Sequence, residues 1–180
     1  MKTGYLIALA TPQDCVELAV LVNSAYRGDS SRQGWTTEAD YIGGQRSDPA
    51  ILNSAVSTPG SSIYCLRAHA GGEILACVQV QLNAENEIYL GMLTVKPTLQ
   101  ARGLGRILLA HVETVAATKN ARRIFMTVVQ IRDTLIAWYE RRGYRRTGDI
   151  KPFPYGKSEF GEPLRDDLHF VVLEKKITPL

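Results

Sequence analysis

The segment that decides the fold spans residues 93–106 and reads Leu93-Thr94-Val95-Lys96-Pro97-Thr98-Leu99-Gln100-Ala101-Arg102-Gly103-Leu104-Gly105-Arg106. Its apolar start predicts a strand, which Pro97 ends because proline cannot donate to a β-ladder. Beyond Gly103, apolar residues recur at helical spacing up to residue 118. The segment is therefore predicted to run from a strand through a glycine-bearing loop into a helix.

The start of this predicted helix has the chemistry of an anion site. The first N–H groups of a helix lack intrahelical acceptors and carry the positive end of its dipole, which favours phosphate. Gly103 and Gly105 allow close approach to the backbone, and Arg102 and Arg106 add positive charge. A plain loop remains the alternative for a lone G-x-G. A Rossmann fingerprint is excluded by Leu108, and no P-loop lysine motif is present.

The rest of the chain predicts alternating strands and helices. Short turns join three strands between residues 62 and 95, which predicts an antiparallel meander. Asp133 is predicted to cap a helix that runs through Arg142. The fold class is α/β (α+β), with a mixed, mostly antiparallel sheet flanked by helices in a single domain. The predicted strands are 5–10, 63–68, 74–82, 87–95, 122–129, 144–150 and 168–173, and the predicted helices follow Thr11, open at Thr36 or Thr37, and cover 50–56, 103–118 and 133–142.

Composition narrows the class of protein. A chain of 180 residues, 45% hydrophobic and 22% charged, is typical of one globular domain. A net charge of +3 does not indicate a nucleic-acid or membrane partner. Cys15, Cys65 and Cys77 are too few and too widely spaced for a disulfide framework or a zinc site, so we expect reduced core thiols and no metal. No leader and no run of eighteen apolar residues is present, which predicts a cytoplasmic protein.

Residues Gln100 to Gly105 read Q-x-x-G-x-G, and this segment resembles the acetyl-CoA-binding motif of the GNAT superfamily of N-acetyltransferases. Residues 135–144, which include Tyr139-Glu140 and Gly143-Tyr144, are similar to the later Y-E-x-x-G-F/Y segment of that superfamily. The order of predicted elements also agrees. The resemblance implies acetyl-CoA as co-substrate, with contacts from Leu93, Thr94, Val95, Gln100, Ala101, Arg102, Gly103, Leu104, Gly105 and Arg106.

The resemblance also implies roles around the reacting atoms. Tyr139 matches the tyrosine that protonates the departing CoA thiolate, a transfer between groups with pKa values of about 10 and 8.5. Packing on a helical stripe is the alternative role for Tyr139. Arg132 stands where the family often has asparagine, and it is expected to contact a CoA phosphate or to be a solvated loop residue.

The candidates for a general base are weaker. Tyr89 stands where histone-type members carry a glutamate, and Glu87 lies two residues earlier on the same strand face. Glu87 could receive the proton of the amine or could be a solvated acid, and many members have no dedicated base. Gly91 is expected either to mark the strand bulge that opens the cofactor cleft in this family or simply to pack against a large side chain.

The predicted reaction is direct acetyl transfer from acetyl-CoA to an amine of a small molecule or peptide, without a covalent enzyme intermediate. The alternative is a non-catalytic acyl-CoA-binding module. Nucleic-acid binding is a third class of function. The arginine pairs at 141–142 and 145–146 do not favour it, because these pairs fit a solvated face. The acceptor is expected to be selected by residues 32–45 and 152–160. A homodimer is possible by resemblance. Residues 96–146 hold 11 of the basic and 3 of the acidic side chains, which concentrates positive charge at the motif.

Overall fold

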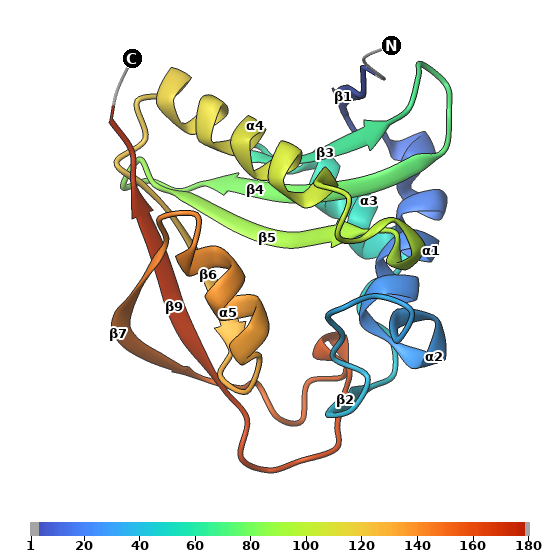
Figure 1. Cartoon of the computed structure of the whole chain (residues 1–180), viewed down its shortest axis with the longest axis vertical. Coiled ribbons are helices and arrows are strands. Elements are labelled where there is room, and N and C mark those ends of the chain that lie inside the picture. Colours follow the sequence, from blue (N-terminus) through green and yellow to red (C-terminus); the bar gives the residue numbers. More distant parts are fainter. Residues whose placement is uncertain (1–3, 179–180) are drawn as a thin grey trace.

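The computed structural model describes residues 4–178, which form one seven-stranded sheet and one two-stranded sheet. The order of the large sheet is β1-β3-β4-β5-β6-β9-β7, and only the β5–β6 pair is parallel (Figure 1). This confirms the predicted mixed, mostly antiparallel sheet. The strands are β1 Leu6–Leu9, β2 Ile42–Gly43, β3 Ser61–Arg67, β4 Ile74–Leu82, β5 Ile88–Val95, β6 Arg123–Val129, β7 Arg145–Pro152, β8 Glu162–Pro163 and β9 His169–Lys176.

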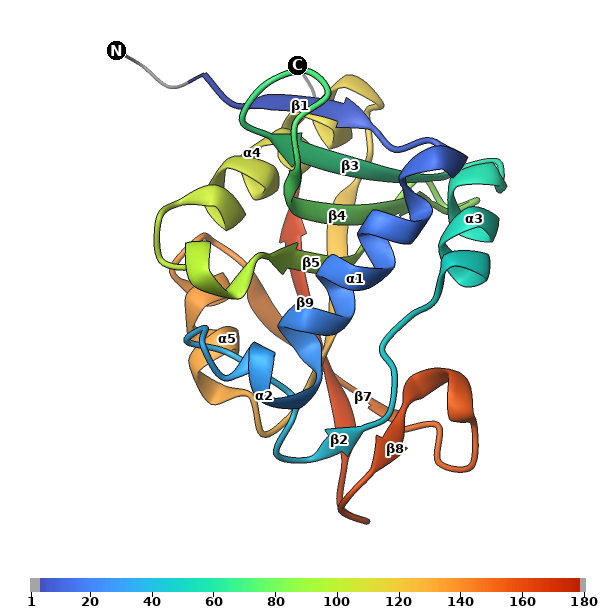
Figure 2. The same cartoon turned by 90° about the vertical axis from the view of Figure 1, so that its right-hand side faces the viewer.

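Helices cover both faces of the large sheet (Figure 2). On one face, α4 and α5 share a core with β4, β5 and β6 that includes Leu108, Val112 and Ile136. On the other face, α1 and α3 pack on β3, β4 and β5 through residues such as Leu18, Val22 and Leu52. The helices are α1 Cys15–Tyr26, α2 Gly28–Ser31, α3 Pro49–Ser57, α4 Leu104–Thr118 and α5 Asp133–Glu140, with single 3₁₀ turns at Pro12–Asp14, Pro97–Leu99 and Ser158–Phe160.

Two predicted helix starts are wrong. No helix opens at Thr36 or Thr37, because the Thr37 hydroxyl accepts the Ala39 N–H at 3.0 Å and folds the chain into a turn. Helix α5 begins at Asp133, and Arg132 rather than Asp133 is its N-cap, since the Arg132 carbonyl already accepts the Ile136 N–H at 2.9 Å. The helix ends at Glu140, before the predicted Arg142.

A β-bulge interrupts the pairing of β4 with β5. Cys77 faces Thr94 and Gln79 faces Gly91, so two residues of β5, Met92 and Leu93, oppose the single residue between them on β4. Met92 takes the left-handed conformation with φ +52°. Beyond this point β5 has left β6, because the parallel pairing covers only Ile88–Ile124 and Tyr89–Phe125. Figure 1 shows the two strands diverging. The predicted bulge next to Gly91 is therefore present, and a Cβ at Gly91 would also lie 3.1 Å from the Tyr89 ring.

The three cysteines are free and buried, which confirms the predicted core thiols. Cys65 and Cys77 lie directly opposite each other on β3 and β4. Within residues 4–178, no group of three or more His, Cys, Asp and Glu side chains is placed to hold a metal ion. The same part of the chain has no helix long and apolar enough to span a membrane.

Candidate functional site

A cleft of about 460 Å³ opens between the end of β5 and the starts of α4 and α5. The divergence of β5 from β6 exposes its first wall, and the loop from Gln100 to Gly103 forms its second wall. Every residue that the sequence assigned to the cofactor lines this cleft, and so does Tyr139. The predicted lining residues are Leu93, Thr94, Val95, Gln100, Ala101, Arg102, Gly103, Leu104, Gly105, Arg106 and Arg132.

The backbone along this loop is set up to bind an anion. Within the described residues, the N–H groups of residues 101–106 have no acceptor in the protein, while the next amide, that of Ile107, bonds the Gly103 carbonyl at 3.0 Å. Gly103 caps α4 with φ +89°, and Ala101 has φ +62°. This left-handed turn is what leads the loop into the helix. Six consecutive amides without protein acceptors form a cradle suited to a pyrophosphate.

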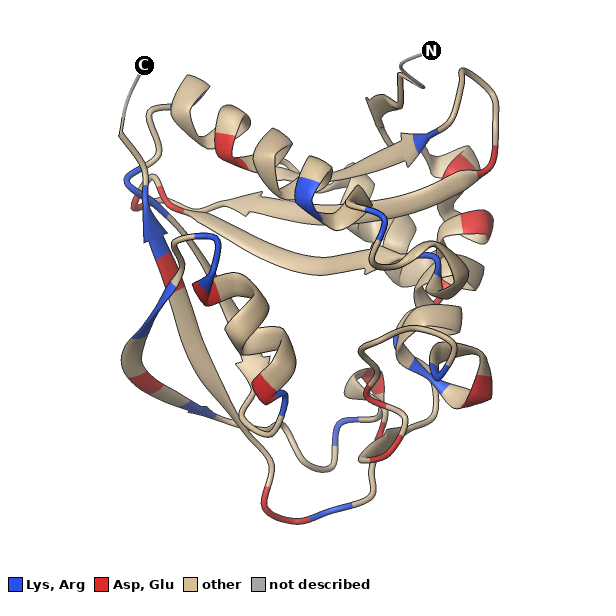
Figure 3. Cartoon of the chain, viewed as in Figure 1, with Lys and Arg blue, Asp and Glu red and all other residues tan. Residues whose placement is uncertain are grey.

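The side chains around the cradle are positively charged. Arg102, Arg106, Arg132 and Arg142 line the cleft, and its lining residues include no aspartate or glutamate. Figure 3 shows the basic positions on the loop before α4 and on its first turns. Arg132 is bonded to Glu38 and Thr36. A polyphosphate would therefore meet the other three guanidinium groups and no acid, which suits a CoA-like ligand.

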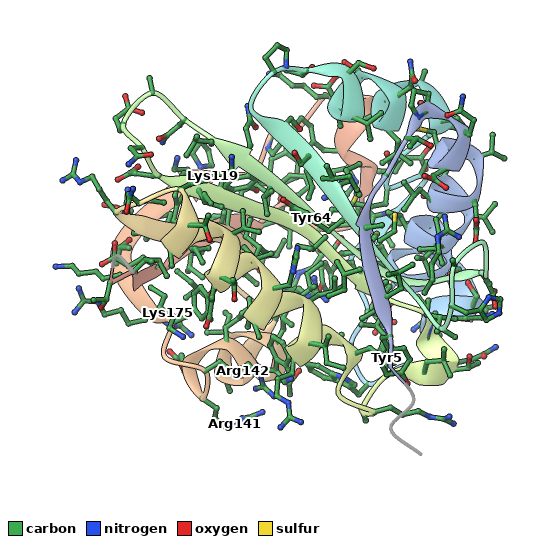
Figure 4. The ribbon with its side chains drawn as sticks, turned by 90° about the horizontal axis from the view of Figure 1, so that it is seen from above. Tyr5, Tyr64, Lys119, Arg141, Arg142 and Lys175 are labelled. Carbon is green, nitrogen blue, oxygen red and sulfur yellow. The ribbon has the colours of Figure 1, made fainter. Side chains whose placement is uncertain are left out.

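Arg142 differs from its predicted place on a solvated face. Its guanidinium stacks 3.7 Å from the centroid of the Trp138 ring, and its Nη1 donates to the Trp138 carbonyl at 2.6 Å. Arg141, Arg145 and Arg146 are exposed, as expected. Figure 4 shows Arg141 and Arg142 at the end of α5. The stacking on Trp138 is what turns Arg142 toward the cleft while its neighbour points to solvent.

The loop at Gly34 and Trp35, within the segment 32–45 expected to select the acceptor, forms part of this first cleft. The Trp35 N–H donates to Gln100 Oε1 at 2.9 Å, and Gln100 Nε2 donates to the Val95 carbonyl at 3.3 Å. A Cβ on Gly34 would overlap the end of the Gln100 side chain, so a larger residue there would displace the Gln100 amide from its bond to Trp35. Trp35 and Trp138 then lie with ring centroids 6.5 Å apart across the cleft. Gln100, the first residue of the motif, therefore fastens this loop to the end of β5.

Two tyrosines lie at the inner end of the cleft. Tyr139 is 4% exposed, and burial raises its pKa above the usual value of a phenol, so it holds its proton. Tyr26 on α1 donates from its hydroxyl to the Leu93 carbonyl at 2.9 Å. Burial raises the Tyr26 pKa as well. The bulged strand is thus anchored from α1 at the residue where its sheet pairing is lost.

A second cleft, of about 180 Å³, adjoins the first through the gap between β5 and β6. The two clefts share Tyr26, Leu93, Arg132, Leu135 and Tyr139. Besides the shared Tyr26 and Tyr139, the aromatic side chains on the second cleft are Tyr89, Phe153, Phe160 and Phe170, and its charged ones are Arg27, Glu38, Arg46 and Arg132. A ligand in each cleft would therefore meet the other beside Tyr139.

The expectation that Arg132 is solvated is wrong, and its charge is already engaged. Its Nη1 donates to Glu38 Oε1 at 2.9 Å and its Nη2 donates to Thr36 Oγ1 at 2.8 Å. Glu38 Oε2 accepts from Arg27 Nη1 at 2.7 Å. Burial raises the Glu38 pKa, but Arg132, Arg27 and Arg46 outweigh it, so the net shift is downward and the carboxylate stays charged. The buried triad ties the loop after α1 to the start of α5.

The two predicted bases lie in different places. Glu87 lines neither cleft, and it pairs with Arg123 Nε at 2.8 Å. Hydrogen bonds from Arg123 lower its pKa, so it is a poor proton acceptor. It is also not the solvated acid of the alternative interpretation, since its side chain is only 15% exposed. Tyr89 does line the second cleft, where its hydroxyl lies 3.1 Å from Thr127 Oγ1.

Several lining residues were not predicted. Tyr26, Trp138 and Arg142 read as residues of helix faces or helix ends, and Arg46 lies one residue beyond the segment expected to select the acceptor. Glu38, Phe153 and Phe160 fall within the predicted segments 32–45 and 152–160, and they line the second cleft. Tyr26 follows Val22 at i+4, so it continues the apolar face of α1. This spacing alone could have indicated that Tyr26 faces the sheet.

Comparison with known proteins agrees with this geometry. A family model described as the acetyltransferase (GNAT) family matches residues 29–144, more than half of the chain. The search of curated proteins finds no match.

Solved structures share the fold across nearly the whole chain. The ribosomal-protein-S18-alanine N-acetyltransferase from Escherichia coli is 17% identical, with a TM-score of 0.69 over 98% of this chain and 96% of the other. An N-acetyltransferase from Staphylococcus aureus is 13% identical, with a TM-score of 0.71 over 97% and 99%.

A protein described as a streptothricin acetyltransferase from Bacillus anthracis, solved with acetyl coenzyme A, is 18% identical, with a TM-score of 0.57 over 69% of this chain and 67% of the other. The match of the family model, together with the motif and its cleft, shows that this chain is a member of the GNAT family of acetyltransferases.

Proposed function

We propose that this chain, acting as one acetyltransferase domain, transfers an acetyl group directly from acetyl-CoA to the neutral amine of an acceptor bound in the second cleft. The observation that carries the proposal is the row of six unbonded amides at residues 101–106, facing a cleft with four arginines and no acid. Such a surface fits the pyrophosphate of CoA. Acetyl-CoA supplies the activated thioester, and a related structure holds that ligand.

The residues of this chain would act on the reaction by position and by proton transfer. The amine nitrogen forms a bond to the acetyl carbon and loses one proton, the carbon–sulfur bond breaks, and the sulfur gains one proton. Tyr139 lines both clefts and keeps its phenolic proton, so we assign it the role of donor to the sulfur. Placing both reactants in adjoining clefts supplies much of the rate gain through proximity.

The first wall of the cleft would hold the thioester arm. Residues 93–95 lie where β5 has left β6, so this edge of the strand can pair with an extended ligand in a β-like manner, apart from the Leu93 and Val95 carbonyls, which already accept from Tyr26 and Gln100. Tyr26 fixes this wall by bonding the Leu93 carbonyl. Proton removal from the amine is assigned to water, because Glu87 is engaged with Arg123 and both oxygens of Glu38 are bonded to arginines.

Calorimetry with acetyl-CoA and a thiol-release assay with a panel of amines test this function. We expect acetyl-CoA binding in the micromolar range and CoA release that depends on an added amine. The variant Arg106→Gln should bind acetyl-CoA more weakly than the protein with Arg122→Gln, which changes an exposed arginine outside both clefts. Absence of acetyl-CoA binding at millimolar ligand would contradict the proposal.

A further inference from the structure

The second cleft carries an excess of positive charge that its own residues do not neutralise. Arg27 and Arg132 share the single carboxylate of Glu38, at 2.7 Å and 2.9 Å. Arg46 is the remaining cation on the lining. In residues 4–178, no carboxylate lies within salt-bridge distance of the Arg46 guanidinium, which acts on Glu38 only from farther away, and it makes no side-chain hydrogen bond to the protein. The cleft therefore presents three arginines against one glutamate.

Arg46 is held in place despite having no ionic partner. Asn23 on α1 clamps its backbone, with Oδ1 accepting the Arg46 N–H at 2.7 Å and Nδ2 donating to the Ser47 carbonyl at 2.8 Å. The Arg46 guanidinium lies over the ring of Tyr26, 5.3 Å from its centroid. Tyr26 is the residue whose hydroxyl bonds the Leu93 carbonyl on the bulged strand. A half-buried guanidinium is thus fixed next to the junction of the two clefts.

The remaining walls are apolar and the space is small. Phe153 and Phe170 stack at 5.6 Å, and Tyr89 contributes an aromatic ring from β5. The volume of about 180 Å³ is below the range of roughly 300–1,000 Å³ typical of sites for drug-sized ligands. The cleft thus suits a small apolar body. A cationic acceptor such as a polyamine would face the arginines without a free acid to balance it, since Glu38 is already paired twice.

From this arrangement, and resting on the proposed acetyl transfer, we propose that the acceptor is a small primary amine that carries a carboxylate and an apolar or aromatic body, with Arg46 as the residue that binds the carboxylate. A guanidinium binds a carboxylate through two parallel N–H···O bonds. This geometry would turn the amine of an α-amino acid toward the shared residues Leu93 and Tyr139. Arg46 is accordingly a specificity-determining residue, and Asn23 positions it.

Matched ligands test this assignment. The first series is L-phenylalanine, L-phenylalaninamide and phenethylamine, and the second is L-leucine, L-leucinamide and isoamylamine. Binding is measured by calorimetry with and without saturating CoA, and kcat/KM is measured by thiol release, with each rate divided by the fraction of neutral amine. We expect the carboxylate of at least one series to be preferred over its amide and its decarboxylated amine by about 10- to 100-fold.

Variants assign the preference to Arg46. In Arg46→Gln the preference should fall to within about threefold, and Arg46→Lys should keep part of it, because lysine retains the charge but not the fork. Arg122→Gln is the matched control and should keep the full preference. Acetyl-CoA affinity is measured on all variants and should not change with Arg46→Gln, since Arg46 does not line the first cleft.

Three results would overturn the assignment: no carboxylate preference in either series, a preference that survives Arg46→Gln, or selective binding of spermidine. Ligand binding is measured both with and without CoA. If the protein fails to bind acetyl-CoA, the proposed function is contradicted, but the carboxylate preference of the second cleft can still be measured. Acetylation of all amines at equal rates would leave acetyl transfer standing and refute the role of Arg46.

Discussion

Gln100 accepts the backbone N–H of Trp35 at 2.9 Å, across 65 residues of sequence, and this bond seals one side of the first cleft. The motif glutamine therefore acts through its side chain on a loop, while the neighbouring amides are left for a ligand. It also links two segments of the family match, the loop at residue 35 and the start of α4.

Replacing Gln100 by leucine should weaken acetyl-CoA binding. The variant Gln100→Leu loses the acceptor for the Trp35 N–H and the donor to Val95, so the loop at Gly34 and Trp35 loosens. We expect the Kd for acetyl-CoA to rise by about tenfold, which corresponds to the net free energy of one or two hydrogen bonds. Calorimetry measures the affinity, and the fluorescence of Trp35 reports the loop. Gln33→Leu, in the same loop but exposed, should change neither, and equal effects in both variants would contradict this role of Gln100.

The hydroxyl of Tyr139 separates a catalyst from a passive acyl-CoA-binding module. Tyr139→Phe keeps the ring and its packing but removes the proton donor, so kcat should fall by about 10²- to 10⁴-fold with little change in acetyl-CoA affinity. Tyr144→Phe is a matched control, because Tyr144 is buried 5.7 Å away and lines neither cleft. Single-turnover rates measure the effect. Unchanged turnover in Tyr139→Phe would favour the passive module or another donor.

The charge of Glu38 should make stability depend on acidic pH. Because the folded-state pKa of Glu38 lies below its value in the unfolded chain, its contribution is fully present above about pH 5 and is lost as the pH falls through the folded pKa. Glu38→Gln leaves two buried arginines without their carboxylate and should cost about 3–5 kcal/mol at neutral pH. Urea denaturation from neutral to acidic pH should show a flatter pH dependence for this variant than for the natural protein.

Glu140→Gln is the control for Glu38→Gln. It removes an exposed carboxylate that lies 3.6 Å from Arg146, so its free energy of unfolding should stay within about 1 kcal/mol of that of the natural protein. A similar loss in both variants would mean that the buried triad contributes no more than a surface ion pair.

The two motif glycines should differ in what they tolerate. Gly103 has φ +89°, so Gly103→Ala forces a left-handed alanine and should cost about 1–2 kcal/mol of stability together with acetyl-CoA affinity. A Cβ on Gly105 would make ordinary contacts at 3.6 Å with Trp138 and Val95, so Gly105→Ala should shift stability by less than about 0.5 kcal/mol. Urea denaturation compares the stability of the two variants. A larger loss of stability from Gly105→Ala than from Gly103→Ala would contradict the role of Gly103 as the left-handed cap of α4.

The sequence predicted those helices, strands and turns that depend on the local pattern of residues. The strand, loop and helix around Gln100–Gly105 follow from apolar periodicity and glycine placement, and the three-strand meander follows from its short turns. Thr37 shows the limit of local rules, because its hydroxyl can start a helix or a turn; here it accepts the Ala39 N–H of a turn, while Arg132 donates to the hydroxyl of the neighbouring Thr36, 96 residues away from it in the sequence. Arg132 and Glu38 are 94 residues apart in the sequence, so no sequence spacing could show that they form a buried ion pair.

The bulge at Met92 makes the length of β5 as important as its composition. Ile88 and Leu90 face the core under α4, Met92 faces the core under α1, and Leu93 and Val95 return to the α4 side. One additional residue thus shifts the in-out alternation midway along the strand. Loss of one residue here would restore regular alternation: Leu93 and Val95 would stay on the α4 side, but Met92 would lose its place in the core under α1 and the bulge at which β5 leaves β6 would disappear. Conservative exchanges at the same positions would keep both. This strand should therefore be among the segments of the chain most sensitive to single-residue deletion.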